Sequence, residues 1–429
     1  MLKVLFFILF VLFKFFLFEI DEESKILQNS PEILKSTIIN DKYEIAHDEL
    51  KKSGKFSTEI FVYKDYENRV KPLLEDFTKM KVKDSLTVKL IEREKFLNFL
   101  KEDITENYGN EKELLIFKTL GFIDDVNYFY DELFEINRSR LSYFNKKTRC
   151  SYTVALWDSD FLVGYELINL WQDDHYDIVS FLDENDNLTF DEKMARHAFI
   201  YGKSGFLANE VFRTSFSRFT GNQSPFLNQR QPLNSLKESL VNQRYWQRNY
   251  GFQKPIVANY YYFPIVEGHI FNAFLYGNME DTFLNSSYKK PPKTTSDIIH
   301  FYKYKEGKEL PKIDDSRFLL NITKKYNITH RDRLGEFGIN TYYQTFSGDS
   351  YNSPSNGWVF DILYIIFNKN EDKNTNQECI KDTKKKGFIW YILLENKEFS
   401  SGLFKIFAFC QKNKFEISGN DEYFYLHSY

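Results

Sequence analysis

Cysteine is scarce in this chain, and this scarcity argues against two kinds of site. Only Cys150, Cys379 and Cys410 occur among 429 residues, and no two of them form a CxxC pair. Such a set argues against a disulfide scaffold and against a zinc site built from cysteines. Basic residues are not in excess either: the net charge is −4 and the pI is about 6.1. The chain therefore has no electrostatic reason to bind nucleic acid.

The N-terminal apolar run is too short for an ordinary membrane-spanning helix. The run Val4–Phe13 follows Lys3, and Lys14 separates it from Phe15–Phe18. A spanning helix needs about 20 apolar residues. A positive start followed by a short apolar core is typical of a secretory signal. No small-residue cleavage site follows, so residues 1–20 are interpreted as a signal peptide or a signal-anchor. We expect an exported protein, periplasmic or associated with the cell envelope, that can contact the membrane through this apolar segment.

The overall composition is that of a folded protein with a substantial core. Hydrophobic residues make up 42% of the chain and charged residues 28%. The 44 Phe and 29 Tyr accompany heavy Lys, Asn and Ile usage, which we interpret as an A/T-rich coding bias and not as a binding feature. Residues 21–85 are expected to be a linker with an irregular helical segment, and residues 86–429 a single domain.

The apolar spacing predicts a mixture of helices and a minor sheet, the α+β class. Residues 140–156 alternate in polarity and predict two strands around a turn at Asn145–Thr148. Residues 215–250, rich in Asn, Gln, Ser and Pro, are expected to form an excursion from the core. The predicted helices cover residues 90–99, 111–120, 128–137, 165–175, 191–212 and 264–277.

The most informative segment is GYELINLWQDDHYDI, residues 164–178. Zinc peptidases of the H-E-x-x-H type place two His at i and i+4 on one face of a helix, with the Glu between them as general base. Here the Glu is present as Glu166, but the two flanking positions are Tyr165 and Asn169. The pattern is that of a metallopeptidase helix without its metal ligands.

Other segments follow in a recognisable order. They are GFIDD (121–125), SYFNKKT (142–148), YELINLWQDDHYDI (165–178), ARHAFIYGKSGFL (195–207), the long stretch 267–304 and RLGEFGI (333–339). Together they resemble a family of bacterial gluzincin-type zinc metallopeptidases, over roughly residues 86 to 365. The most specific match is the stretch from Tyr288 to His300, in which spacing and residue types both agree. The resemblance implies a zincin-like fold that is helix-rich with a small mixed sheet.

The departures from that family decide the expected function. The resemblance implies that two His of the helix and a later Glu would hold zinc, and these positions are Tyr165, Asn169 and Tyr201 here. A carboxamide and a phenol with a pKa of about 10 are poor zinc ligands. Without the metal, water keeps a pKa of about 16 instead of about 7, so the nucleophile is lost. We expect a pseudopeptidase that holds no cofactor, although the family uses zinc.

Two alternatives stay open for the residues around this site. Glu166 is either a relic that forms hydrogen bonds in the core, with Tyr165 and Tyr201 as partners, or a base for other chemistry. His175 and His197 could be ligands of a relocated metal site or residues of the former cleft; His197 lies one helical turn before Tyr201.

The sequence thus predicts an exported, inactive, metallopeptidase-like protein with a binding or structural role. Its partner would be an unidentified protein or peptide in the former peptide cleft, and nucleic acid is not expected. The alternative is a hydrolase or peptidase with a relocated or non-standard metal site that uses Glu166 as general base.

Overall fold

The computed structural model describes the chain in segments. They are residues 61–62, 64–86, 88–138, 140–154, 160–183, 188–220, 254–279, 283–307, 309–312, 316–347, 357–368, 386–394, 415–419 and 423–428. The predicted signal segment, residues 1–20, and most of the predicted excursion at 215–250 lie outside them. Within these segments, no helix combines the length and apolar character needed to cross a bilayer.

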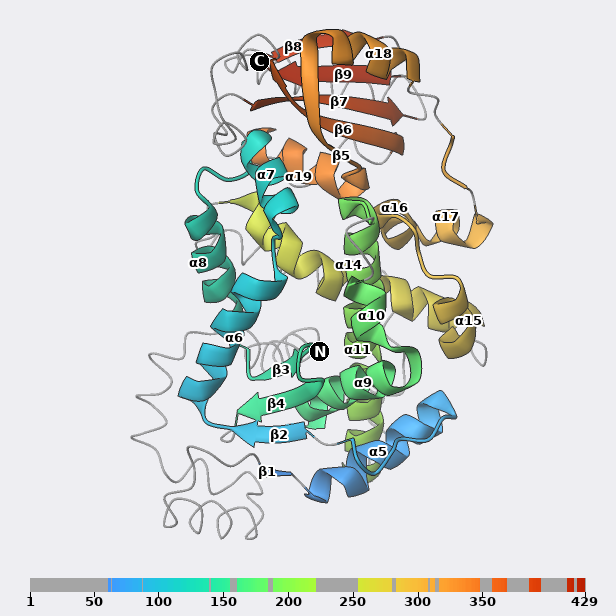
Figure 1. Ribbon diagram of the computed structural model, residues 1–429. Coiled ribbons are helices and arrows are strands. Elements are labelled where there is room, and N and C mark those ends of the chain that lie inside the picture. Colours follow the sequence, from blue (N-terminus) through green and yellow to red (C-terminus); the bar gives the residue numbers. More distant parts are fainter. Residues whose placement is uncertain are drawn as a thin grey trace, which may run out of the picture. The chain divides into compact units, whose positions relative to one another are not determined.

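The described elements confirm an α+β architecture, rich in helix with two small sheets (Figure 1). The helices are α5 Lys64–Thr78, α6 Arg93–Asn107, α7 Glu111–Thr119, α8 Val126–Asn137, α9 Asp160–Tyr176, α10 Ile178–Asp183, α11 Phe190–Thr220, α14 Pro255–Met279, α15 Phe283–Lys289, α16 Thr295–Ile299, α17 Phe301–Glu306, α18 Ser316–Lys325 and α19 Gly335–Ser347. The strands are β1 Phe61–Val62, β2 Val88–Ile91, β3 Ser142–Asn145, β4 Cys150–Val154, β5 Tyr326–Asp332, β6 Trp358–Asn368, β7 Lys386–Leu394, β8 Phe415–Gly419 and β9 Tyr423–Ser428.

The chain divides into two compact units, each made of several segments. Unit 1 comprises Met1–Ile104, Phe134–Trp171 and Val211–Gly221, and unit 2 comprises Thr105–Leu133, Gln172–Glu210 and Asn222–Tyr429. The division runs through α6, α8, α9 and α11. Part of the 21–85 region, expected to be a linker with an irregular helix, forms β1 and the 15-residue helix α5.

Unit 1 contains a four-stranded mixed sheet in the order β1-β2-β4-β3 (Figure 1). The β2–β4 pair is parallel and the other two pairs are antiparallel. The predicted hairpin is confirmed: the amide of Thr148 donates to the side-chain oxygen of Asn145 at 2.9 Å and closes the turn. Edge-on ring contacts of Phe96 with Tyr143 and of Phe99 with Tyr152 place α6 on one face of the sheet.

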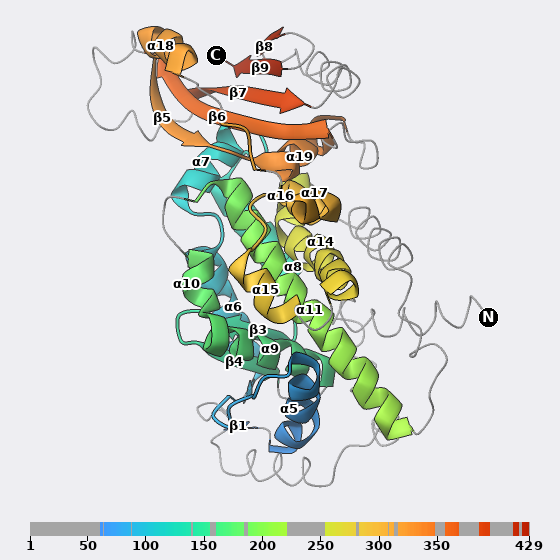
Figure 2. The same ribbon diagram turned by 90° about the vertical axis from the view of Figure 1, so that its right-hand side faces the viewer.

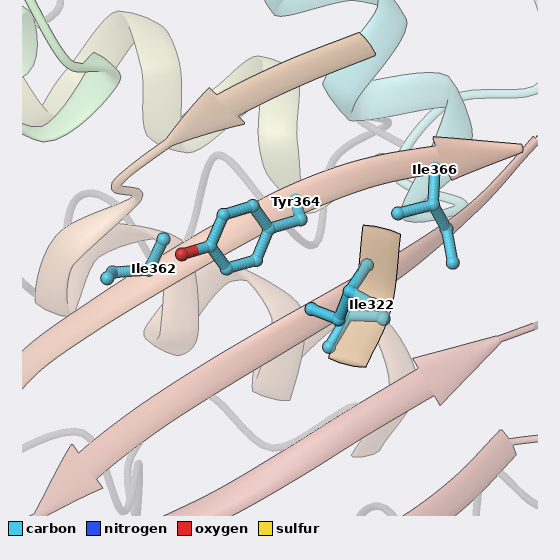
Figure 3. Packing of buried hydrophobic residues seen from close by; sticks show 5 residues of the cluster. Ile322, Ile362, Tyr364 and Ile366 are labelled. Carbon is cyan, nitrogen blue, oxygen red and sulfur yellow. The ribbon is translucent and has the colours of Figure 1, made fainter. Parts of the chain in front are cut away.

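Unit 2 contains a five-stranded antiparallel sheet in the order β5-β6-β7-β9-β8. Figure 2 shows α18 on one side of this sheet and α19 on the other. Ile322 of α18 packs into a buried cluster with Ile362, Tyr364 and Ile366 of β6, and Ile389 of β7 (Figure 3).

A close helix crossing forms the centre of the helical part of unit 2. A Cβ atom on Gly202 of α11 would lie 2.0 Å from the carbonyl carbon of Gly268 on α14, and a Cβ on Gly268 would lie 2.0 Å from the carbonyl oxygen of Ala198. Asn272 donates to the carbonyl of Phe199 at 3.1 Å across the same crossing. Only glycine at both positions allows the two backbones to approach this closely.

Three predicted boundaries are wrong, each for a local reason. Residues 88–91 form β2 and the helix begins at Arg93, since Val88-Lys89-Leu90-Ile91 pairs with two neighbouring strands. Helix α14 begins at Pro255 and contains Pro264, although an internal proline is costly enough to suggest a helix start. Helix α11 continues to Thr220, so residues 215–220 belong to a helix and not to an excursion.

Candidate functional site

Glu166 lies on the side of α9 that faces the β3–β4 hairpin of unit 1. Its exposed fraction is 0%. The Oγ of Ser142 donates to Oε1 at 2.9 Å, and the Oγ of Ser151 donates to Oε2 at 3.2 Å. Ser142 pairs with Thr153, and Ser151 pairs with Phe144. Because side chains alternate across a strand, this register places both serines on the same face of the sheet, beneath α9.

The third hydrogen bond comes from Asn169, one of the positions that the resemblance assigns to a zinc ligand. Asn169 is buried and its Nδ2 donates to Oε2 of Glu166 at 3.3 Å. Tyr165 is half-buried, and its phenol is not a hydrogen-bond partner of this carboxylate. The prediction that Tyr165 would satisfy Glu166 is therefore wrong. Adjacent residues on a helix point in different directions, whereas residues three apart share a face.

The electrostatic environment shifts the pKa of Glu166 upward, with burial as the largest cause. Burial raises the pKa of its carboxyl, while the charge of Arg140 and the hydrogen bonds from Ser142, Asn169 and Ser151 act in the opposite direction. A general base must reach the proton that it removes. A carboxyl with no exposed surface and three donors around it cannot contact a substrate in this conformation, so the arrangement fits a structural carboxyl.

The remaining predicted site residues lie in unit 2. His197 is buried on α11, and its ring meets the ring of Tyr201 edge-on with centroids 5.7 Å apart. The predicted one-turn relation between these two residues is confirmed. His175 lies near the end of α9, half-buried, with its Nδ1 3.3 Å from Oδ2 of Asp174. Among the described residues, no group of three or more His, Cys, Asp or Glu is placed to hold a metal ion.

The donor set at the positions that the resemblance assigns to zinc does not suit that ion. It consists of two phenols, Tyr165 and Tyr201, and the carboxamide of Asn169, which already donates to Glu166. Zinc in proteins is held by thiolate, imidazole and carboxylate. No chemical step through a zinc ion follows from these residues.

A buried polar network in unit 2 was not anticipated from the sequence. Gln172 of α9 donates to Ser204 of α11 at 2.6 Å and accepts from the hydroxyl of Tyr288 on α15. Tyr176 stacks on Tyr288 with ring centroids 3.6 Å apart. Three of the motif-bearing segments, 164–178, 195–207 and 267–304, therefore meet here. The sequence offered one signal for this network: Gln172 is a large polar residue among the apolar residues of its helix.

Lys203 lies in the same network. Its Nζ donates to Ser287 at 2.9 Å, and lies 3.8 Å from the ring centroid of Tyr288 and 4.1 Å from that of Phe199. Its exposed fraction is 0%. Burial holds the pKa of this amine well below its ordinary value. The network is a packed polar layer between helices.

Comparison of the chain with protein-family models, with curated proteins and with solved structures finds no match.

Proposed function

We propose that this chain is an exported, catalytically inactive relative of gluzincin-type zinc metallopeptidases, with a binding or structural role. The observation that carries the proposal is the environment of Glu166: the residue at the position of the general base is buried and fully engaged by Ser142, Ser151 and Asn169. In an active zinc peptidase this carboxylate has to face the metal-bound water.

The local architecture is consistent with a zincin-like fold. Helix α9 lies on a small mixed sheet, and β3 is an edge strand of that sheet within the described residues. An extended peptide would add to the sheet as a further strand along this edge. The proposed partner is accordingly a protein or peptide with an extended segment, held without being cleaved.

The first test is metal content. Protein purified without a metal-affinity tag would be measured by mass spectrometry of the metals, before and after incubation with zinc and removal of the excess. We expect far less than one zinc per chain and no change in thermal stability on adding zinc. About one tightly held zinc per chain, together with chelator-sensitive peptide cleavage, would overturn the proposal in favour of a relocated metal site.

A matched variant separates ligand loss from an incorrect alignment. The double variant Tyr165→His and Asn169→His restores the pair of helix ligands that the resemblance implies, and both positions lie in unit 1. We expect this variant to bind zinc more tightly than the natural chain and to gain thermal stability with the metal, since metal binding to the folded state is folding energy. A folded double variant that binds zinc no better than the natural chain would count against these positions as ligands.

Export is tested separately. Cells that produce the full chain and cells that produce a chain without residues 1–20 would be fractionated. The full chain is expected in the envelope or periplasmic fraction and the truncated chain in the cytoplasm. Equal distribution of both chains would refute the targeting interpretation without affecting the zinc result.

A further inference from the structure

Acidic side chains from several elements meet in unit 2 where α11, α16, α19 and β6 come together. Four of the carboxylates are buried, with exposed fractions of 5% or less: Asp191, Asp332, Glu336 and Asp361. Among the residues that the structure describes, the permanent cations in contact with this group are Arg333 and Lys112. Buried negative charge that exceeds the buried positive charge is costly, and bound protons relieve it.

Asp361 has to be the ionised member of the group. Its two oxygens accept four hydrogen bonds at 2.9 to 3.0 Å, from the amides of Leu334 and Gly335 and the indoles of Trp358 and Trp390. A carboxylate offers about four lone-pair directions, and all four partners can only donate. Burial raises the pKa of Asp361, but a proton on it would displace one of these donors.

Asp191 can hold a proton, because one of its partners is a hydroxyl. Its Oδ1 lies 2.6 Å from the hydroxyl of Thr295 and 2.8 Å from the Thr295 amide, and its Oδ2 lies 3.0 Å from Nε of Arg333. The hydroxyl of Thr295 can reverse and accept a hydrogen bond from a protonated Asp191, because a hydroxyl both donates and accepts. The exposed fraction of Asp191 is 0%.

In the closed contact, the backbone of Gly335 packs directly against the carboxyl of Asp191. Gly335 has a φ of +67°, and a Cβ there would lie 1.8 Å from Oδ1 of Asp191. The charged and titratable groups on the surrounding elements are Glu192 and Lys193 on α11, Asp297 on α16, His300 at its end, Asp332 and Arg333 at the end of β5, Glu336 on α19 and Asp361 on β6. Glu192 shares Arg333 at 3.7 Å, and His300 is 2.8 Å from Glu336. Arg333 is thus divided among several carboxylates.

We propose that the contact between Asp191 and Thr295 is a proton-operated joint, which holds α16 against the start of α11 when Asp191 carries a proton and loosens when the proton leaves. The proposal follows from the excess of buried carboxylates over permanent cations and from the four hydrogen bonds that Asp361 already accepts. It is independent of the peptidase resemblance. Burial raises the pKa of Asp191 to about 7, against the opposing charge of Arg333. The joint would therefore respond to pH in the neutral range.

The direction of the response follows from linkage. The carboxyl of Asp191 has a pKa of about 7 in the closed joint and an ordinary value of 3.8 when opened to water. The closed form therefore binds the proton more tightly. The stabilisation of the closed joint by this proton is complete below pH 3.8 and is lost as the pH rises to about 7. Between these values the equilibrium constant for opening should rise about tenfold per pH unit, and then level off.

Hydrogen exchange of two amides reports this opening directly. The amide of Thr295 donates to Asp191, and the amide of Phe337 donates to Oγ1 of Thr295 at 3.1 Å. Protection factors, corrected for the intrinsic pH dependence of exchange, would be measured on the full chain from about pH 5 to about pH 8.5. We expect protection of both amides to fall about tenfold per pH unit up to about pH 7 and to be constant above it. Protection that is flat or rises between pH 5 and 7 would overturn the proposal.

Two variants test whether Asp191 is the group that binds the proton. Asp191→Asn removes the titration and should abolish the pH dependence at Thr295, whereas Glu192→Gln, which alters a half-buried carboxyl on the same arginine, should retain it. Loss of the pH dependence in Glu192→Gln, or its persistence in Asp191→Asn, would place the proton elsewhere and refute the assignment. If Asp191→Asn does not fold, the test rests on the pH dependence in the natural chain and on its retention in Glu192→Gln. Absence of either would refute the proposal.

Discussion

Substitution of Glu166 by Gln and by Ala should have very different effects on stability. A carboxamide can keep every hydrogen bond: its oxygen at the Oε2 position accepts from Ser151 and Asn169, and its NH2 group at the Oε1 position donates to the Ser142 hydroxyl. Glu166→Gln should therefore lie within about 1 kcal/mol of the natural chain at neutral pH.

Glu166→Ala should be much more costly. It removes the buried carboxyl that accepts hydrogen bonds from Ser142 and Asn169, at about 1–3 kcal/mol for each bond lost, and adds a cavity. The cost at Ser151 is smaller, because its hydroxyl can still donate to the backbone carbonyl of residue 166, which lies 3.1 Å away. The expected loss is about 2–6 kcal/mol, from two groups at about 1–3 kcal/mol each.

The assay is urea unfolding followed by circular dichroism, with Glu94→Ala on the exposed face of α6 as the control, expected within about 0.5 kcal/mol of the natural chain. Because burial raises the pKa of Glu166, its stabilising effect is greatest below its ordinary pKa and is lost as pH rises through the folded value. The free energy of unfolding of Glu166→Gln should therefore increase relative to that of the natural chain as pH rises. Equal losses for Gln and Ala would refute the reasoning, since they would mean that Glu166 is needed as an ion.

Four further substitutions, at three sites, test other parts of unit 2, each by the same unfolding assay. Gly202→Ala or Gly268→Ala should cost at least about 3 kcal/mol, because the added methyl lies 2.0 Å from backbone atoms of the other helix; a loss below about 1 kcal/mol would contradict the close crossing. Lys203→Met should gain stability relative to the natural chain as pH falls from about 9 to about 7. The lowered pKa of Lys203 means that the natural chain binds fewer protons when folded than when unfolded. A stability difference that does not vary with pH would indicate a charged amine. Asp361→Asn should cost at least about 2 kcal/mol, because an NH2 group would face N–H donors; an unchanged midpoint would argue against an ionised Asp361.

Local signals in the sequence were enough for the hairpin and for α9. The turn at Asn145 and the alternation on both sides predicted β3 and β4, and the apolar spacing around Glu166 predicted the helix. The bond from Asn169 to Glu166 was also accessible, since residues three apart share a helix face.

The serine partners of Glu166 could not be predicted in the same way. Ser142 and Ser151 precede it by 24 and 15 residues, and either serine would point away from α9 if the strand register moved by one position. The register is fixed by pairing within a sheet that also contains β2, so local pattern alone does not determine it. The joint at Asp191 depends on a contact with Arg333 across 142 residues of sequence, for which a single chain carries no signal.

The burial of Glu166 bears on why a chain without the ligand residues would still have this glutamate. A carboxyl kept only for catalysis would lose its purpose with the metal and could become any residue that fits the helix. Here Ser142, Ser151 and Asn169 all donate to it, so an apolar replacement would leave buried donors unsatisfied. These hydrogen bonds explain the presence of Glu166 by packing alone, and the glutamate by itself is no argument for peptidase activity.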